Sequence, residues 1–200
     1  MENKQKMTNL LVELQTEELP PKALRKLSEA FAEGVQKSLD EAHFLEEGSK
    51  TTVYGAPRRL AVHITNVRAV SPDETFRQKL VPVKVGIAAD GSATPALKKK
   101  MAALGIDCPV EKLERVNDGK NEQLVYTGVR AGVTVKDALQ KALEDAVKAL
   151  PIPKVMNYQL VDGVTTVQFV RPVKHLVVLY GDAVLEGVKM FGLTAGRTTM

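Results

Sequence analysis

Residues 9–24 carry the sequence Asn-Leu-Leu-Val-Glu-Leu-Gln-Thr-Glu-Glu-Leu-Pro-Pro-Lys-Ala-Leu, in which a short apolar run ends in two acids and two prolines. The apolar run at 10–14 has the length of a buried strand. Pro20 and Pro21 end any strand ladder, and their fixed backbone angle suits the first turn of a helix. This segment therefore predicts a strand near 9–15, an acidic turn and the start of a helix.

Apolar residues continue at helical spacing after the prolines, which predicts a helix over residues 21–42. They are Ala23, Leu24, Leu27, Ala30, Phe31, Val35 and Leu39. Glu17 and Glu18 come just before the positive end of this helix. Carboxylates at such a position are about as likely to compensate the helix dipole as to have a catalytic role. The spacing leaves both interpretations of the two acids open.

The rest of the chain alternates strand and helix signals. We expect strands near 51–55 and 59–69, an extended segment at 75–85, a helix at 95–104, a hairpin of 113–116 with 123–130, a helix after residue 134, and strand-rich runs at 164–170, 176–180 and 184–191. Thr94 and Thr134 have the form of helix caps, and Gly105 has the form of a helix stop. Asn117-Asp118-Gly119-Lys120 marks the hairpin turn.

Several of these strands follow one another without an intervening helix. This order favours an α+β fold over a doubly wound parallel sheet, with a mostly antiparallel sheet, about three helices and a final antiparallel meander. A parallel strand-helix-strand unit over 9–55 stays open. No low-complexity linker interrupts residues 1–200, so we expect one continuous domain, with any division into two lobes near 150–155, where Pro151 and Pro153 end a helix.

Four separated stretches form a recognisable series. They are Thr-Glu-Glu-Leu-Pro-Pro-Lys-Ala-Leu at 16–24, Ala-Pro-Arg-Arg-Leu-Ala-Val at 56–62, Leu-Pro-Ile-Pro-Lys at 150–154 with Phe-Val-Arg-Pro-Val at 169–173, and Gly-Leu-Thr-Ala-Gly-Arg-Thr-Thr at 192–199. In this order they resemble motifs of the bacterial glycyl-tRNA synthetase β subunit, over nearly the whole chain. The chain departs from that family at Gln15, at Asn157-Tyr158 and at Lys174-His175, where the family has Gly, Arg-Trp and His-Trp.

The resemblance implies a non-catalytic partner chain in an α2β2 heterotetramer that joins glycine to its tRNA. In that family the α subunit activates glycine with ATP and magnesium, so we expect no cofactor on this chain and no activity from it alone. The expected partners are the α subunit and glycine tRNA, in the cytoplasm, with neither DNA nor membrane. Family members continue into a helical HD-type domain and an anticodon-binding domain, so we expect this chain to be an N-terminal fragment.

Positive charge is concentrated in one part of the chain. The net charge is +4, but residues 50–100 hold 10 basic and 3 acidic side chains. Such a block can neutralise RNA phosphates, or it can be an ordinary solvated surface. Aromatic residues make up only 4% of the chain, which favours contacts to the RNA backbone over base stacking. The RNA-binding candidates are Arg58, Arg59, Lys98, Lys99 and Lys100 in this block, with Arg171, Lys174 and Arg197 in the later motifs.

The acidic turn and its prolines also have a structural interpretation. Glu17, Glu18, Pro20 and Pro21 can form an interface motif. In this hypothesis Arg58 or Arg59 pairs with Glu17 or Glu18 and holds the turn against the sheet. The alternative to an RNA-binding role for the chain is a purely structural assembly domain with no RNA contact of its own.

Several chemistries have little support in the sequence. His43, His63 and His175 are far apart and lack the spacing of metal ligands, and Cys108 is the only cysteine, so no internal disulfide forms. The Gly-Leu-Thr-Ala-Gly-Arg-Thr stretch at 192–198 lacks the spacing and the lysine of a phosphate-binding loop. A hydrolase acting on an RNA-linked ester would need Glu17 or Glu18 with His175, but a nucleophile and a base at suitable spacing are missing.

Overall fold

The computed structural model describes residues 7–88, 91–117, 122–160 and 162–198. The chain divides into two compact units, of which unit 1 combines residues 1–72 with 133–200 and unit 2 comprises Asp73–Gly132. The division thus falls at 72/73 and 132/133, whereas the sequence predicts any division near 150–155. Unit 2 is an insertion whose two boundaries are about 60 residues apart in sequence and meet in the fold, where the amide of Ser71 donates to the carbonyl of Val133 and the amide of Gly132 donates to the Asp73 carboxylate.

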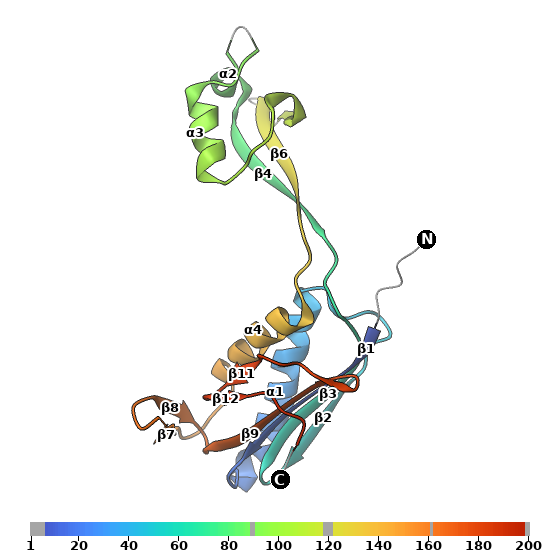
Figure 1. Ribbon diagram of the computed structural model, residues 1–200, viewed down its shortest axis with the longest axis vertical. Coiled ribbons are helices and arrows are strands. Elements are labelled where there is room, and N and C mark those ends of the chain that lie inside the picture. The colour runs from blue at the N-terminus through green and yellow to red at the C-terminus, as the bar shows by residue number, and fades with distance from the viewer. Residues whose placement is uncertain (1–6, 89–90, 118–121, 161, 199–200) are drawn as a thin grey trace. The chain divides into compact units, whose positions relative to one another are not determined.

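Unit 1 is built on a five-stranded sheet with two helices packed on one face (Figure 1). Its strands have the order β10-β9-β1-β3-β2, and every neighbouring pair is antiparallel. The elements are β1 (Met7–Thr16), α1 (Pro21–Glu41), β2 (Thr51–Ala56), β3 (Arg59–Arg68), α4 (Val135–Lys148), β9 (Val173–Tyr180) and β10 (Ala183–Val184). The predicted α+β fold with a mostly antiparallel sheet is confirmed.

The connections of unit 1 form two split crossovers. Strands β1 and β2 are parallel to each other and are joined by α1, but β3 lies between them. In the same way β3 and β9 are parallel, are connected through α4, and have β1 between them. This order of elements, β-α-β-β-α-β, is that of ferredoxin-like folds. The strand-helix-strand unit left open over 9–55 therefore exists in this split form.

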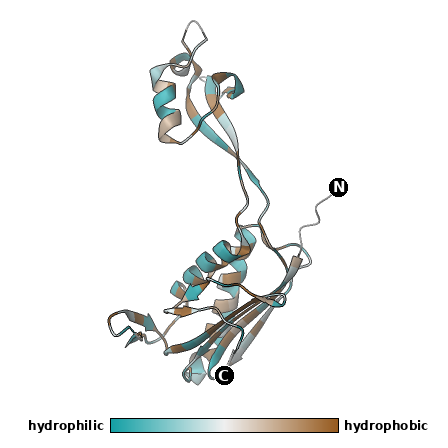
Figure 2. Cartoon of the chain, viewed as in Figure 1, coloured by the Kyte–Doolittle hydropathy of each residue, from teal (hydrophilic) through white to brown (hydrophobic). Residues whose placement is uncertain are grey.

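The core of unit 1 lies between the sheet and the helices. Along β1 the side chains of Leu10, Val12 and Leu14 are fully buried on the helix face, whereas the alternate side chains between them point to the other face. Helix α1 contributes a stripe at helical spacing that includes Leu27, Phe31, Val35 and Leu39. The outer sides of α1 and α4 are hydrophilic (Figure 2). Sequence periodicity and burial thus agree for both elements.

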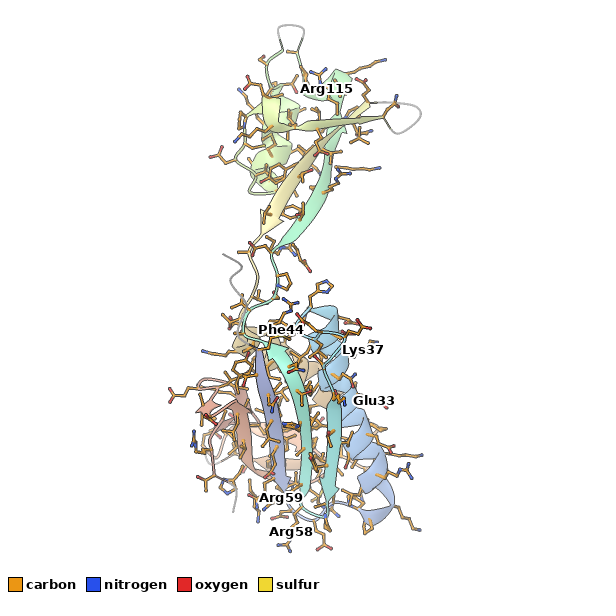
Figure 3. All side chains as sticks on the ribbon, turned by 90° about the vertical axis from the view of Figure 1, so that its right-hand side faces the viewer. Glu33, Lys37, Phe44, Arg58, Arg59 and Arg115 are labelled. Carbon is orange, nitrogen blue, oxygen red and sulfur yellow. The ribbon has the colours of Figure 1, made fainter. Side chains whose placement is uncertain are left out.

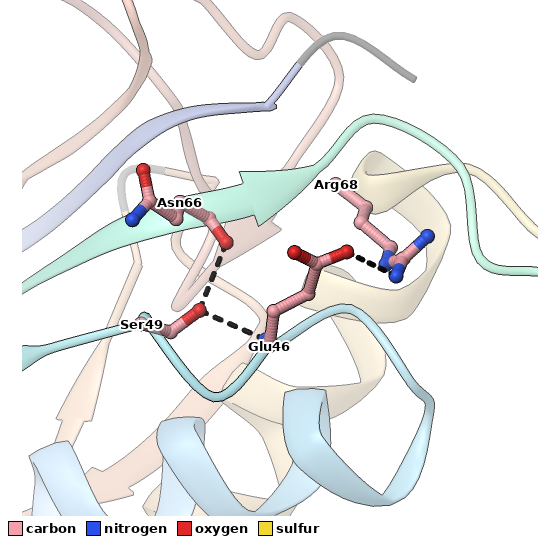
Figure 4. A network of polar contacts seen from close by, with 4 residues as sticks. All are labelled: Glu46, Ser49, Asn66 and Arg68. Carbon is pink, nitrogen blue, oxygen red and sulfur yellow. Dashed lines mark hydrogen bonds and ion pairs between the residues drawn. The ribbon is translucent and has the colours of Figure 1, made fainter. Parts of the chain in front are cut away.

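A polar network ties the loop after α1 to the end of β3 (Figure 4). The Ser49 hydroxyl donates to the backbone carbonyl of Asn66 and accepts from the amide of Glu46, both at 2.9 Å. The Glu46 carboxylate pairs with Arg68. Asn66 has a φ of 54°, which asparagine tolerates better than most residues. The network closes the end of the sheet at which Phe44 is completely buried.

Unit 2 has its own small core under a three-stranded antiparallel sheet of order β4-β6-β5. Its elements are β4 (Glu74–Pro82), α2 (Val83–Gly86), α3 (Pro95–Ala103), the 3-10 turn η1 (Val110–Lys112), β5 (Glu114–Asn117) and β6 (Glu122–Arg130). The core cluster consists of Leu80, Leu97, Met101, Leu113 and Leu124. The predicted hairpin is confirmed as β5 with β6, although most of its turn, residues 118–121, lies outside the described residues.

Both predicted threonine caps are present. The hydroxyl of Thr94 accepts from the amide of Leu97 at the start of α3, and the hydroxyl of Thr134 accepts from the amide of Asp137 at the start of α4. Helix α1 instead begins after Pro20 without a side-chain cap. Local capping and proline signals therefore located the starts of α1, α3 and α4.

The last quarter of the chain forms three short pairings and no continuous meander within the residues described there. They are β7 (Met156–Gln159) with β8 (Thr166–Phe169), β9 with β10, and β11 (Lys189–Met190) with β12 (Leu193–Thr194). Among the described residues, β8 pairs only with β7. Arg171 and Pro172 separate β8 from the next strand, β9, which pairs with β1 in the five-stranded sheet. Proline has no amide hydrogen, which breaks a ladder at this point.

Gly34 sets the approach of α1 to α4. A Cβ atom at this position would lie 2.8 Å from Ala146 Cβ and 3.0 Å from Ala146 Cα, both on α4. We predict that Gly34→Leu lowers the free energy of unfolding by about 1–3 kcal/mol, because the added side chain forces the two helices apart. Thermal denaturation followed by circular dichroism measures this loss. Gln36→Leu, at an exposed position of the same helix, is the control and should change stability little.

Candidate functional site

Three sequence motifs meet at one end of the unit 1 sheet, which we call the motif end. The β1–α1 turn, the β2–β3 turn and the loop before β9 are joined there by backbone hydrogen bonds. The amides of Thr16, Glu17 and Leu19 donate to the carbonyls of Arg58, Pro172 and Pro57, at 2.9, 2.9 and 2.6 Å. Motifs that are far apart in sequence therefore form one structural unit.

Basic side chains hold the acidic turn in place. Lys174 Nζ lies 3.3 Å from Glu17 Oε1, and Arg171 Nε donates to the backbone carbonyl of Glu18 at 3.0 Å. The hypothesis that Arg58 or Arg59 pairs with Glu17 or Glu18 is wrong, because the cation that pairs with Glu17 is Lys174. Two RNA-binding candidates, Arg171 and Lys174, are thus engaged within the chain.

Arg58 and Arg59 are neighbours with different surroundings. Both lie at the motif end, opposite the end at which Phe44 is buried (Figure 3). Arg59 NH1 lies 3.8 Å from Glu13 Oε2, and the Glu13 side chain is only 12% exposed. Arg58 is exposed, and its guanidinium forms no ion pair within the described part of the chain. Arg59 therefore balances a carboxylate on the sheet, whereas Arg58 is available to a partner.

Glu13 is the member of this site that the sequence predictions missed. It occupies the one charged position in the apolar run of β1 and points away from the helices, and its Oε1 atom is buried without a hydrogen-bond partner among the described residues. A charge in the middle of an apolar strand is a visible sequence signal for such a role. Its partner could not be named without the register of β1 against β3, which places Gln15 opposite Arg59.

A hollow of about 480 Å³ opens at the motif end. It is lined by Gln15, Thr16, Glu17, Glu18, Arg58, Lys174 and His175. The structure thus brings Glu17, Glu18 and His175 together, as the hydrolase hypothesis requires. The only hydroxyl in the lining, that of Thr16, donates to the carbonyl of Glu17 at 2.8 Å. The hollow is therefore suited to polar binding, and its lining offers no free hydroxyl or thiol as a nucleophile.

The remaining candidates are not part of the motif end. Arg197 donates to the carbonyl of Asp182, which follows the far end of β9. In unit 2, Lys98, Lys99 and Lys100 are exposed on α3 and form no ion pair with any described residue. Leu97 and Met101, on either side of them in sequence, bury the opposite face of the helix.

The described residues contain neither a cluster of metal ligands nor a helix that could span a membrane. Within those ranges, no group of three or more His, Cys, Asp or Glu side chains is placed to hold a metal ion. His43 lies just after α1 with a φ of 59°, and His63 lies on β3. None of the helices in the described residues is long and apolar enough to cross a membrane.

The family model described as glycyl-tRNA synthetase β subunit matches residues 10–200. The chain belongs to this family. Curated relatives carry the name glycine–tRNA ligase β subunit: that of Janthinobacterium sp. (strain Marseille) is 55% identical over 192 residues, and that of Acidovorax ebreus (strain TPSY) is 53% identical over 192 residues. Each match covers 96% of this chain and 27% of the relative. This member of the glycyl-tRNA synthetase β-subunit family thus spans about a quarter of the length of those relatives, and the resemblance seen in its motifs is confirmed.

Charge reversal at the two adjacent arginines distinguishes their roles. We predict that Arg59→Glu destabilises the folded chain by about 1–3 kcal/mol, because it leaves the mostly buried Glu13 carboxylate facing a second negative charge. Arg58→Glu should change the free energy of unfolding by less than about 0.5 kcal/mol, because this side chain is exposed and forms no ion pair with a described residue. The melting temperatures of both variants measure the difference. Equal losses would contradict the assignment of Arg59 to Glu13.

Proposed function

We propose that this chain supports ATP-dependent charging of glycine tRNA as part of the β subunit of glycine–tRNA ligase, by binding tRNA and by assembling with the catalytic α subunit in an α2β2 enzyme of the cytoplasm. ATP and magnesium act on the α subunit in this proposal. This chain has no group of metal ligands in its described residues and contributes binding and positioning. By itself it should form no glycyl-adenylate.

The observation that carries the RNA-binding half of the proposal is the lysine run on α3. Three consecutive residues of a helix are about 100° apart, so Lys98, Lys99 and Lys100 fan out over the whole exposed face. No described acid neutralises them. Such a surface attracts phosphates without regard to base sequence, and its affinity falls as salt rises.

The other basic candidates contribute less free charge. Arg59, Arg171 and Lys174 are already engaged with groups of this chain, and Arg197 donates to a backbone carbonyl. Removing any of them would also disturb the fold. We therefore assign the phosphate contacts to the three lysines of α3.

The assembly half of the proposal rests on the motif end. Its loops are joined by backbone bonds, so the exposed side chains on it are held on a rigid base. Arg58 and Glu18 are exposed there, and neither side chain forms an ion pair with a described residue. A free cation beside a free anion suits a protein partner with complementary charges better than a uniformly negative RNA. The α subunit is the partner that we assign to this surface.

Neutralising the three α3 lysines tests the RNA contact. We predict that Lys98→Ala, Lys99→Ala and Lys100→Ala together weaken binding of the 200-residue chain to glycine tRNA at least about tenfold at low salt. The slope of log affinity against log salt should fall by about one unit for each phosphate that the variant no longer neutralises. Fluorescence anisotropy with labelled tRNA, across a salt series, measures both quantities.

The control removes equal charge from exposed helical positions of unit 1. Lys22→Ala, Lys26→Ala and Lys141→Ala change the net charge by the same amount, and none of these lysines has an acidic partner among the described residues. This triple variant should keep its tRNA affinity. Equal weakening in both triple variants would show that only net charge matters. Absence of binding by the folded, unaltered chain would favour the purely structural alternative.

Charge reversal at the motif end tests assembly. We predict that Arg58→Glu and Glu18→Lys, each alone, weaken association with the α subunit by about 2–5 kcal/mol if their partners are buried in the interface, and less if they are at its rim. Surface plasmon resonance with immobilised α subunit measures the affinity. Both variants should keep the melting temperature of the unaltered chain, and unchanged association would remove the motif end from the interface.

A further inference from the structure

A second hollow, of about 630 Å³, lies within unit 2 beside the lysine run. Its walls come from α3 and from the loop at residues 105–110. Most of the lining is aliphatic or sulfur-containing, and Lys98 stands in it as the first of the three lysines. The residues used below are Lys98, Met101, Ala102, Ile106, Cys108 and Val110.

The hollow is formed by the way α3 ends. Gly105 has a φ of 66°, which glycine adopts readily, and the chain then turns back so that the amide of Ile106 donates to the carbonyl of Met101 at 2.9 Å. This turn sets the loop against the side of the helix, with Met101 only 7% exposed beneath it. The apolar space is therefore a consequence of the helix stop at Gly105.

The loop also presents unpaired backbone groups. The amide hydrogens and carbonyl oxygens of Asp107 and Cys108 bond to no other described residue. An apolar hollow with a few polar groups at its rim is the usual form of a site for a small organic ligand. A planar heteroaromatic group, with apolar faces and a polar edge, matches this lining. The size of the hollow lies within the range of such sites.

Resting on the function proposed above, we propose that this hollow takes an unpaired nucleobase of the RNA whose phosphates lie on the lysines of α3. A base is attached to its phosphate through one sugar, so a strand that follows Lys98 brings a base to the neighbouring hollow. The base faces would contact Met101, Ile106 and Val110, and the base edge would meet the free backbone groups of the loop.

The proposal adds a constraint on the RNA that phosphate contacts alone do not impose. A base in a regular duplex is paired and stacked, so it cannot enter the hollow, whereas bases in loops and single-stranded ends can. The low aromatic content of the sequence disfavours stacking on rings, and the hollow provides thioether and aliphatic contacts in their place. The lysine at its wall favours an anionic polymer over an apolar peptide.

Cys108 provides a direct test, because it is the only cysteine and it lines the hollow. Burial raises the pKa of its thiol, and the charge of Asp107 adds to this effect. A raised pKa means less thiolate at a given pH, so alkylation should be slower than in the urea-unfolded chain and is best followed in mildly alkaline buffer.

The experiment compares N-ethylmaleimide labelling of Cys108, measured by mass spectrometry, with saturating RNA of two kinds. A glycine tRNA transcript, which has unpaired bases, should slow labelling at least about fivefold. A fully paired RNA duplex, at a concentration that also saturates the α3 lysines, should slow it far less. The duplex controls for the electrostatic effect of nearby phosphates on the thiol.

Two adjacent alanines of α3 supply matched variants. Ala102 lines the hollow and Ala103 does not, and both are exposed, so tryptophan at either position should leave the fold intact. Ala102→Trp should fill the hollow and exclude the base. We expect this to weaken binding of the tRNA transcript about tenfold, near the low end of the effects of losing a base stacked on an aromatic ring, because the hollow offers only aliphatic and thioether contacts. Ala103→Trp should leave the affinity unchanged, and neither variant should affect duplex binding.

The outcomes separate this proposal from the one on which it rests. Lysine-dependent tRNA binding with selective protection of Cys108 supports both. Lysine-dependent binding with equal labelling in tRNA and duplex overturns the base site and leaves the phosphate contacts standing. Absence of RNA binding overturns both. Protection of Cys108 by the α subunit, without protection by RNA, identifies a peptide as the occupant and also overturns the base site.

Discussion

The central position of β1 in the unit 1 sheet constrains everything around it. Strands β3 and β9 flank it on both sides, and Leu10, Val12 and Leu14 are fully buried against the helices. A shift of one residue would exchange these side chains with Glu13 and place its carboxylate in the core. The observed register is therefore the one that pairs the backbone of β1 and keeps its charge outside the hydrophobic layer.

The motif end follows from that register. Because β1 ends where β3 and β9 begin, the loops at these three points meet, and the acidic turn contacts groups from both neighbouring strands. Most of the charge brought together there is balanced internally, as Lys174 with Glu17 and Arg59 with Glu13 show. Among the basic candidates, Arg58 is the free cation of the motif end, and three further free cations stand together on α3 of unit 2. This separation is why we assign protein assembly to one surface and RNA to the other.

Local signals predicted the elements well and their partners poorly. The two prolines, the threonine caps and Gly105 located the helices because each acts on the backbone within a few residues. The extent of the insertion at 73–132 and the pairing of β9 with β1 could not be read locally, since both depend on contacts between residues that are far apart in sequence. For the same reason Lys174 was predicted as a phosphate ligand, while its nearest acid was 157 residues away in sequence.

The amino-acid sequence by itself determined the α+β class, the positions of the long helices, the basic block and the family to which this chain belongs, because each of these is encoded in residue order over short distances. Only the tertiary structure decided which charges are free. Whether a lysine or an arginine can meet a phosphate depends on the carboxylates and carbonyls that folding brings within a few ångströms of it, and the hollow beside Lys98 exists only because the chain turns back at Gly105. Those distances are set by packing, which the order of residues does not display.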